Sequence, residues 1–241
     1  MIKVEDLSVA FDNKTILESI SCEIASHLVI LGANGSGKST LAKSISSLNK
    51  YEGNIFIDAK NIQELSLKER AKSLSYIPAK LEIYDSFITV EEFVLLGRFP
   101  YKKSMFEYAQ SDKDIVQKQL KFLGLNHLAQ HTLDTLSSGE QQLILIAQSL
   151  AQQSHIIIFD EPTANLDPNN TKVIAQTIKR LKEKHQVILI THDIHLASYF
   201  DSEVLFIKDK SAELFKADFF TDENLAKLYE TNFTNMVLTY D

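Results

Sequence analysis

The stretch GANGSGKST at residues 32–40 constrains the fold of this chain more than any other feature. The apolar run HLVIL precedes it, and Leu41, Ile45 and Leu48 follow it at helical spacing. Its glycines allow backbone amides to turn inward around phosphate oxygen atoms, and the N-terminus of the following helix adds a positive dipole end. The spacing G-x-x-x-x-G-K-S therefore predicts a strand, a phosphate-binding loop and a helix in succession.

This loop predicts a nucleotide site that uses Mg²⁺. We expect Lys38 to reach the β- and γ-phosphates and the Ser39 hydroxyl to bind the metal. A glycine-rich turn with a chance Lys-Ser pair is the competing interpretation, and the flanking strand and helix patterns disfavour it. The predicted nucleotide-binding residues of the loop are Gly32, Ala33, Asn34, Gly35, Ser36, Gly37, Lys38, Ser39 and Thr40.

Two apolar strands further along the chain end in polar residues. Asp160 and Glu161 follow the run IIIF, and His192 follows ILIT. In doubly wound sheets the carboxyl ends of the strands form the edge where ligands bind, although a solvated strand end is the alternative. Asp160 fits the carboxylate that holds Mg²⁺, and Glu161 fits a catalytic base that polarises the attacking water. His192 is placed to donate a hydrogen bond to the γ-phosphate.

The order of the patterns predicts an α/β fold with a mostly parallel sheet. Short strands dominate the first third, helical patterns occupy residues 85–150, and buried strands return from residue 156. We expect one domain over 1–241, with a core at about 1–84 and 151–241 and an inserted helical subdomain at about 85–150. Within the insertion, residues 111–114 (SDKD) predict a capping box that opens a helix, and residues 137–140 predict a polar loop before a helix that starts at Gln141.

Composition excludes several classes of function. The net charge of −7 weighs against a broad nucleic-acid-binding surface. The single cysteine, Cys22, excludes an intramolecular disulfide. No apolar run approaches the roughly 18 residues of a membrane span, so we expect a cytoplasmic protein without a spanning segment.

Five motifs in order resemble the ATPase subunits of ABC transporters. They are GANGSGKST, LSSGEQQ, IIIFDEP, NLD and ITHD, and the resemblance runs from about Val4 to about Phe215. The resemblance implies a P-loop ABC-type ATPase core with an antiparallel β portion near the N-terminus. It also implies ATP hydrolysis with ATP and Mg²⁺, the latter bound by Ser39 and Asp160.

The resemblance also implies partners. In this family two cassettes form a head-to-tail dimer around ATP, so Ser137, Ser138, Gly139 and Glu140 of one copy would meet the ATP of the other. Asp167 would lie in the loop that crosses the dimer interface, and Phe11 matches the aromatic residue that stacks on adenine. Membrane permease subunits and, indirectly, an external solute-binding protein complete the expected partners. The location implied is peripheral, at the cytoplasmic face of the inner or plasma membrane.

One position departs from the family. Related sequences read Y-x-P-Q at the entry to the helical region, and here the stretch is Tyr76-Ile77-Pro78-Ala79. The family's glutamine touches Mg²⁺ and the attacking water, and Ala79 has no donor or acceptor. Three explanations are open: Lys80 substitutes as a point charge, water fills the gap, or the subunit hydrolyses ATP slowly.

Residues 90–101, VEEFVLLGRFPY, point to a branch of the family. They resemble importers of iron–siderophore complexes, haem or cobalamin, in which a G-R-x-P segment follows this helix, although a family-neutral helix end is the alternative. We therefore expect an ATP-hydrolysing subunit that powers uptake of a chelated metal. The competing hypothesis is a soluble non-transport ABC ATPase, such as an iron–sulfur cluster assembly subunit.

Overall fold

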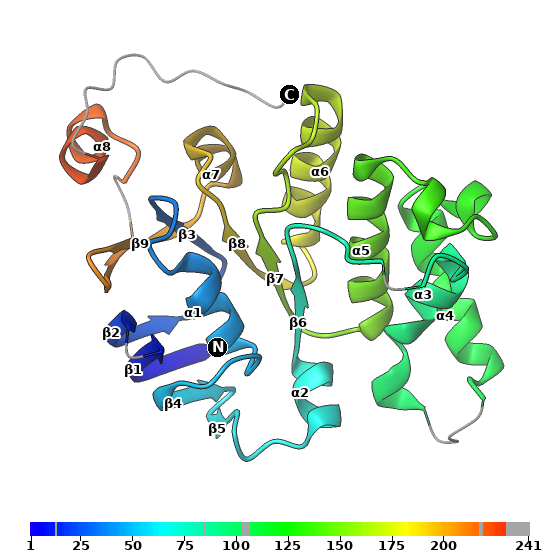
Figure 1. Ribbon diagram of the computed structural model, residues 1–241, viewed down its shortest axis with the longest axis horizontal. Helices are drawn as coiled ribbons and strands as arrows, with labels where there is room; N and C mark the ends of the chain where they lie inside the picture. Colours follow the sequence, from blue (N-terminus) through cyan, green and yellow to red (C-terminus); the bar gives the residue numbers. More distant parts are fainter. Residues whose placement is uncertain (13, 84, 103–106, 217–218, 230–241) are drawn as a thin grey trace.

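The structure is a computed structural model that describes residues 1–241 except 13, 84, 103–106, 217–218 and 230–241 (Figure 1). Its strands form two sheets, a four-stranded one in the order β2-β1-β4-β5 and a six-stranded one in the order β10-β9-β3-β8-β7-β6. The strands are β1 (Ile2–Phe11), β2 (Lys14–Ile24), β3 (Leu28–Gly32), β4 (Glu52–Ile57), β5 (Lys60–Asn61), β6 (Leu74–Ile77), β7 (Ile156–Asp160), β8 (Gln186–Ile190), β9 (Glu203–Lys208) and β10 (Ser211–Phe215).

The first sheet is antiparallel throughout, which confirms the β portion expected near the N-terminus. In the second sheet only the β9–β10 pair is antiparallel, and the other neighbours run parallel. The chain therefore has the predicted α/β fold with a mostly parallel sheet. The helices between β6 and β7 separate two strands that pair directly in that sheet.

Some helices lie beside the parallel sheet, and those between β6 and β7 form a group on one side of it (Figure 1). In the described part of the chain, none is long and apolar enough to cross a membrane. The helices are α1 (Lys38–Ile45), α2 (Leu67–Ser73), α3 (Val90–Leu96), α4 (Gln110–Phe122), α5 (Ser138–Gln152), α6 (Pro168–Leu181), α7 (Ile194–Phe200) and α8 (Asp222–Tyr229), with 3-10 turns at Phe99–Tyr101, Asn126–Leu128 and Leu133–Thr135.

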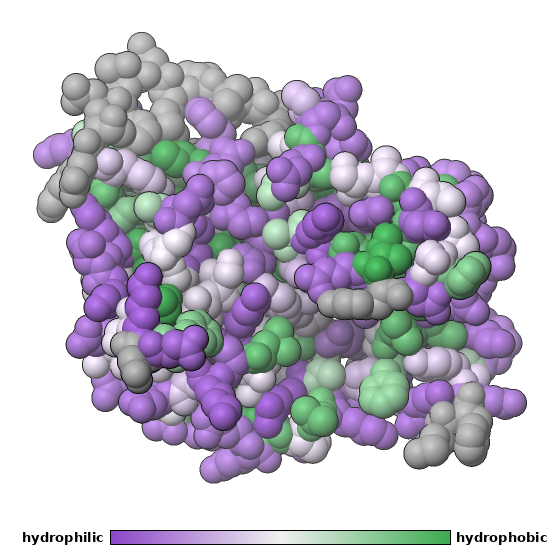
Figure 2. Space-filling model, viewed as in Figure 1, coloured by the Kyte–Doolittle hydropathy of each residue, from purple (hydrophilic) through white to green (hydrophobic). Residues whose placement is uncertain are grey.

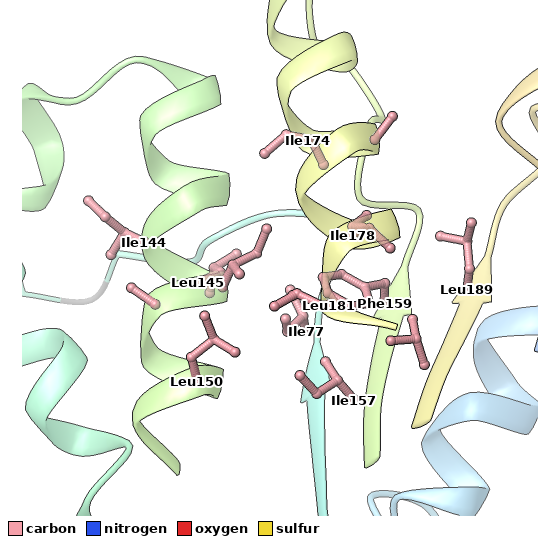
Figure 3. Close-up of a cluster of buried hydrophobic side chains, with 14 of the residues drawn as sticks. Ile77, Ile144, Leu145, Leu150, Ile157, Phe159, Ile174, Ile178, Leu181 and Leu189 are labelled. Carbon is pink, nitrogen blue, oxygen red and sulfur yellow. The ribbon is translucent and has the colours of Figure 1, made fainter. Parts of the chain in front are cut away.

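The parallel sheet separates two hydrophobic cores because successive side chains of a strand point to opposite faces. In β3, Leu28 and Ile30 join a core shared with β1, β2, β4 and α1, whereas Val29 and Leu31 join a core shared with α3 to α7. Strands β7 and β8 alternate in the same way. Figure 3 shows the second core, in which α5 and α6 side chains meet Ile157 and Phe159 of β7. Burial on both faces explains the uninterrupted apolar runs in the sequence.

Two predicted helix starts were wrong. Helix α4 begins at Gln110, and its capping interaction runs from the backbone N–H of Ala109 to Asp112. Helix α5 begins at Ser138, with Ser137 as its N-cap: the backbone N–H of Glu140 donates to the Ser137 hydroxyl, and the Glu140 carboxylate accepts from Ser137. Because of this reciprocal pair, the helix begins three residues before its predicted start at Gln141.

Residues 97–100 (GRFP) have a packing role in this fold. A Cβ at Gly97 would lie 2.3 Å from the Gln148 carbonyl oxygen, so glycine allows α3 to approach α5 closely. Arg98 is 4% exposed and its Nε donates to Asp112 Oδ1 at 2.9 Å. Its Nη1 donates to the Ala151 carbonyl oxygen at 2.7 Å. Arg98 therefore ties the end of α3 to the start of α4 and the end of α5.

We expect Arg98→Ala to lower the free energy of unfolding by about 3–5 kcal/mol, because it leaves the buried Asp112 carboxylate without its cation. Urea unfolding followed by circular dichroism measures the effect. Lys3→Ala is the control, since its ion pair with Glu5 lies at the surface and should contribute less than about 1 kcal/mol. Equal losses in the two variants would contradict the role given to Arg98.

Candidate active site

The predicted phosphate-binding loop connects β3 to α1. Gly35 and Gly37 have left-handed φ angles of 80° and 105°. A Cβ at Gly37 would also lie 2.8 Å from Leu17 Cδ2, so both the backbone conformation and the available space require glycine there. The loop exposes Ala33, Asn34 and Gly35, as an anion-binding turn at a helix N-terminus must.

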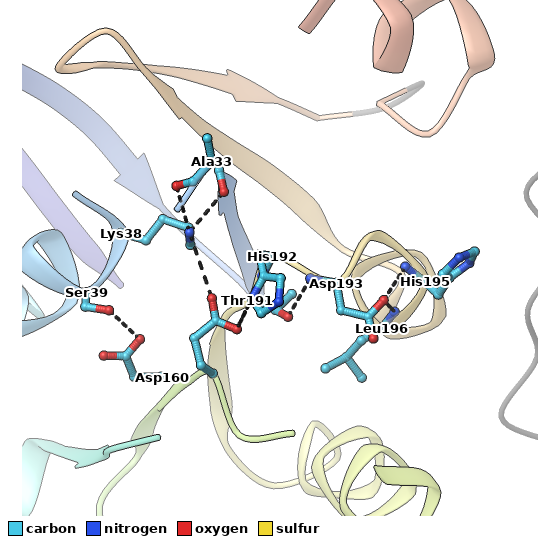
Figure 4. A network of polar contacts seen from close by, with 11 residues as sticks. Ala33, Lys38, Ser39, Asp160, Thr191, His192, Asp193, His195 and Leu196 are labelled. Carbon is cyan, nitrogen blue, oxygen red and sulfur yellow. Dashed lines mark hydrogen bonds and ion pairs between the residues drawn. The ribbon is translucent and has the colours of Figure 1, made fainter. Parts of the chain in front are cut away.

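Lys38 starts α1 and folds back over the loop (Figure 4). Its Nζ donates to the carbonyl oxygens of Gly32 at 2.9 Å and Ala33 at 3.1 Å. The same nitrogen lies 3.9 Å from Glu161 Oε1. Burial lowers the pKa of Lys38, and the carboxylates of Glu161 and Asp160 act in the opposite direction. The amine is thus held at the carboxyl end of β3, beside the end of β7.

Asp160 ends β7 and is 4% exposed. Its Oδ1 accepts from the Ser39 hydroxyl at 2.8 Å, and its Oδ2 accepts from the Tyr76 hydroxyl at 2.6 Å. Burial, followed by the hydrogen bond to Asp160, raises the pKa of Tyr76, so this phenol stays protonated and donates. Both carboxylate oxygens are therefore fixed by hydroxyl groups that come from other elements.

The Ser39 hydroxyl and the Asp160 carboxylate are the hard oxygen ligands that Mg²⁺ takes. In the described part of the chain no group of three or more His, Cys, Asp or Glu side chains could hold a metal by itself. Mg²⁺ sites usually combine one or two carboxylates with substrate phosphates and water, so the donor set fits this ion.

Glu161 follows Asp160 in a left-handed conformation, with φ of 50°. Its backbone N–H donates to the Ile190 carbonyl oxygen at 2.9 Å, which ties the strained residue to β8. Its Oε2 lies 2.8 Å from Nδ1 of His192, which follows β8 (Figure 4). The Glu161 side chain is therefore directed between Lys38 and His192.

The structure thus brings Lys38, Ser39, Asp160, Glu161 and His192 together at one edge of the sheet. Sequence reasoning missed Tyr76 as a member of this group. The tyrosine lies on β6, whose register with β7 pairs Tyr76 with Ile158, two residues before Asp160. Only this pairing of strands could have revealed the contact, because Tyr76 and Asp160 are 84 positions apart in the sequence.

The signature residues and Asp167 lie together elsewhere in the chain. A Cβ at Gly139 would lie 2.4 Å from Asn170 Cγ, so α5 and α6 approach closely here. Asp167 is the N-cap of α6 and accepts from the backbone N–H groups of Asn169 and Asn170. Among the described residues, no hydrogen bond or ion pair joins these residues to the phosphate-binding loop, and their role toward the ATP of another copy stays a prediction.

Phe11 lies at the end of β1, with 48% of its surface exposed. A cavity of about 460 Å³ opens beside the phosphate-binding loop, large enough for part of a nucleotide. Its walls include Asn34, Gly35 and Ile16, but Phe11 is not among them. Stacking of Phe11 on adenine stays a prediction.

Ala79 and Lys80 follow β6 at the same sheet edge as Asp160, because Ile77 pairs with Phe159. Both residues are exposed. Within the described ranges, Lys80 makes no hydrogen bond or ion pair. Ala79 therefore places no hydrogen-bonding side chain at this edge of the sheet.

This arrangement can bind and hydrolyse a nucleoside triphosphate. The two carboxylates differ in their surroundings. Hydroxyl groups donate to Asp160, whereas Glu161 faces His192. The Ser36 hydroxyl oxygen is buried in the loop, with no hydrogen-bond partner in the part that the structure describes, and a phosphate oxygen would satisfy it.

Comparisons with known proteins agree with this chemistry. The family described as "ABC transporter" matches residues 18–164. The manganese transport system ATP-binding protein MntB of Halalkalibacterium halodurans is 30% identical over 96% of this chain and 93% of its own. The "probable siderophore transport system ATP-binding protein YusV" of Bacillus subtilis is 33% identical over 87% of this chain and 78% of its own.

A solved structure extends the likeness to the fold. It is described as a dimeric post-hydrolysis state of the ATP-binding cassette MJ0796 bound to ADP and Pi. It superposes with a TM-score of 0.78 at 28% identity, covering 90% of this chain and 98% of that one.

Proposed function

Because this chain belongs to the ABC transporter family and is an ATPase, we propose that it powers an importer of a chelated metal as the ATP-hydrolysing subunit. The observation that carries the ATP-hydrolysing role is the convergence of Lys38, Ser39, Asp160, Glu161 and His192 at one sheet edge. The sequence similarity to transport proteins named for manganese and siderophores supports a metal as part of the transported solute. Iron–siderophore complexes, haem and cobalamin are the candidate solutes.

Each side chain has a different role in ATP hydrolysis. Lys38 leaves its carbonyl partners to neutralise the β- and γ-phosphates of ATP. Ser39 and Asp160 would hold Mg²⁺, which would supply positive charge to the phosphate oxygens as they become more negative. Glu161 takes the proton of the attacking water. His192 faces that carboxylate in this structure, and it donates to the γ-phosphate in place of the carboxylate when ATP is bound, since a neutral imidazole has one N–H.

Two copies of the chain share each ATP in this proposal. Ser137 and Gly139 of one copy face the γ-phosphate bound by the loop of the other, and the N-terminus of α5 points its dipole at that charge. Asp167 lies in the loop between the copies. The dimeric state of the related cassette bound to ADP and Pi supports this arrangement.

An apolar groove supports a membrane permease as the second partner. It measures about 470 Å³ and is lined by Phe87, Ile88, Leu95, Leu96 and Tyr108, with Asp85 and Glu92 as its acidic members. Figure 2 shows hydrophobic side chains over the region of α3 and α4, beside hydrophilic ones. Exposed apolar patches of this kind mark interaction sites.

The acidic residues of the groove favour contact with the cytoplasmic side of a membrane protein. Cytoplasmic loops of membrane proteins carry an excess of Lys and Arg, which complements the carboxylates at this groove. The subunit would then lie at the cytoplasmic face of the membrane, without spanning it. An external solute-binding protein would act through the permease.

Affinity purification of the tagged chain from detergent-solubilised membranes tests the transport role. We expect a multi-span permease to co-purify, and Phe87→Glu to abolish its recovery while the ATP affinity stays unchanged. Leu48→Glu is the matched control, because Leu48 is also an exposed apolar residue but lies outside the groove. Recovery of a soluble partner, with no permease, would favour the iron–sulfur cluster assembly alternative instead.

Steady-state ATPase assays decide among the three explanations for Ala79. We expect a water molecule to take the place of the family's glutamine side chain. Ala79→Gln and Lys80→Ala should then each change turnover by less than about tenfold, or roughly 1.4 kcal/mol. A loss of tenfold or more in Lys80→Ala would show that the lysine has taken over the role. A large gain in Ala79→Gln alone would show that the native site is slow for lack of the amide.

A further inference from the structure

We infer that Tyr76 is a positioning residue for the Mg²⁺ site, acting through the Asp160 carboxylate. The inference rests on the proposed function and adds a residue to its metal chemistry. Its basis is the hydrogen bond of 2.6 Å from the Tyr76 hydroxyl to Asp160 Oδ2. This length is typical of a hydroxyl that donates to an ionised carboxylate, which is among the stronger hydrogen bonds in proteins.

The two oxygens of the Asp160 carboxylate have different hydrogen-bond partners. Oδ1 of Asp160 faces Ser39, which starts the helix after the phosphate-binding loop, and Oδ2 is held by Tyr76. The phenol therefore fixes the rotation of the carboxylate about its Cβ–Cγ bond and keeps Oδ1 beside the Ser39 hydroxyl. Mg²⁺ demands near-ideal octahedral geometry, so the orientation of its few protein oxygens affects affinity directly.

The tyrosine is itself rigidly held. It lies on β6, which pairs with β7 in parallel register, and its ring packs against the core shared with β1, β2 and α1. The hydroxyl thus extends from a fixed strand to the buried carboxylate. Groups that orient metal ligands in this way typically change metal affinity by 10–100-fold when they are removed.

The departure at Ala79 increases the importance of this contact. Of the four residues Tyr76, Ile77, Pro78 and Ala79, only the tyrosine has a side chain that can donate a hydrogen bond. The end of β6 therefore contributes to the metal site through Asp160, without a polar group at position 79. The role does not require Tyr76 to touch ATP or the metal.

Electron paramagnetic resonance with Mn²⁺ as the probe tests the inference on the whole chain. We expect Tyr76→Phe to weaken Mn²⁺ binding to the protein–ADP complex by about tenfold. Binding of ADP in EDTA, measured by calorimetry, should stay within twofold of wild type. Turnover should recover at high Mg²⁺. Tyr51→Phe is the matched control, because Tyr51 packs against the same core and makes no contact with Asp160.

The outcomes separate this inference from the proposed function. Wild-type Mn²⁺ affinity in Tyr76→Phe would overturn the positioning role while leaving the ATPase assignment intact. An equal loss of Mn²⁺ affinity and of metal-free ADP affinity would also overturn it, since the tyrosine would then serve the whole site. Failure of the wild-type chain to bind ADP at all would overturn the proposed function itself.

Discussion

Replacing Lys38 by alanine should weaken ATP binding by roughly ten- to hundredfold or more. The substitution removes a charge-assisted contact to phosphate, worth roughly 1.5–3 kcal/mol. The buried amine now held by the carbonyl groups of Gly32 and Ala33 is the cation that the structure supplies to the loop. Calorimetric titration with ATP measures the change.

Lys43→Ala provides the control for this prediction. Lys43 lies on the same helix, α1, but is exposed, so its loss should leave the ATP affinity within about twofold. Unchanged affinity in Lys38→Ala would contradict the assignment of residues 32–40 as the phosphate site. A folding defect would appear separately, as a lower urea midpoint.

Glu161→Gln should bind ATP as the wild type does and lose about 10²–10⁴-fold in turnover. The amide has nearly the same shape as the carboxylate, but it cannot accept a proton from the attacking water. Lys38, Ser39 and Asp160 stay in place, so the ground-state contacts are retained. Phosphate release under saturating ATP measures the effect.

The exposed Glu213 offers the matched substitution, since Glu213→Gln removes a charge from β10, away from the site. Its turnover should equal that of the wild type. If Glu161→Gln keeps more than about a tenth of wild-type activity, another group acts as the base. His192, whose Nδ1 lies 2.8 Å from Glu161, would then be the next residue to test.

The parts of the site that follow local rules could be predicted from the sequence. The phosphate-binding loop depends on glycines and a lysine at fixed spacing, and the strand ends at Asp160 and His192 follow apolar runs. Parallel strands bring such ends to one edge, so the meeting of Glu161 and His192 followed from the fold class. The start of α6 also follows a local rule, because Asp167 caps the helix and Pro168 is its first residue.

The remaining contacts could not be predicted because they depend on register and on side-chain direction. Tyr76 reaches Asp160 only through the pairing of β6 with β7. Arg98 looked like a marker of a family branch, and its burial against Asp112 and Ala151 appears only when α3, α4 and α5 pack. The start of α5 was placed too late because Ser137 and Glu140 cap each other, a pattern that can also occur in a loop.

Light scattering of Glu161→Gln with ATP and Mg²⁺ measures whether two copies of the chain close around ATP. With ATP we expect a mass of twice the 27.3 kDa of one chain. With ADP we expect the mass of one chain, and the same for Lys38→Ala/Glu161→Gln with ATP. A monomer at saturating ATP, with nucleotide bound and turnover blocked, would contradict the shared site and leave Ser137 and Gly139 without the role proposed for them.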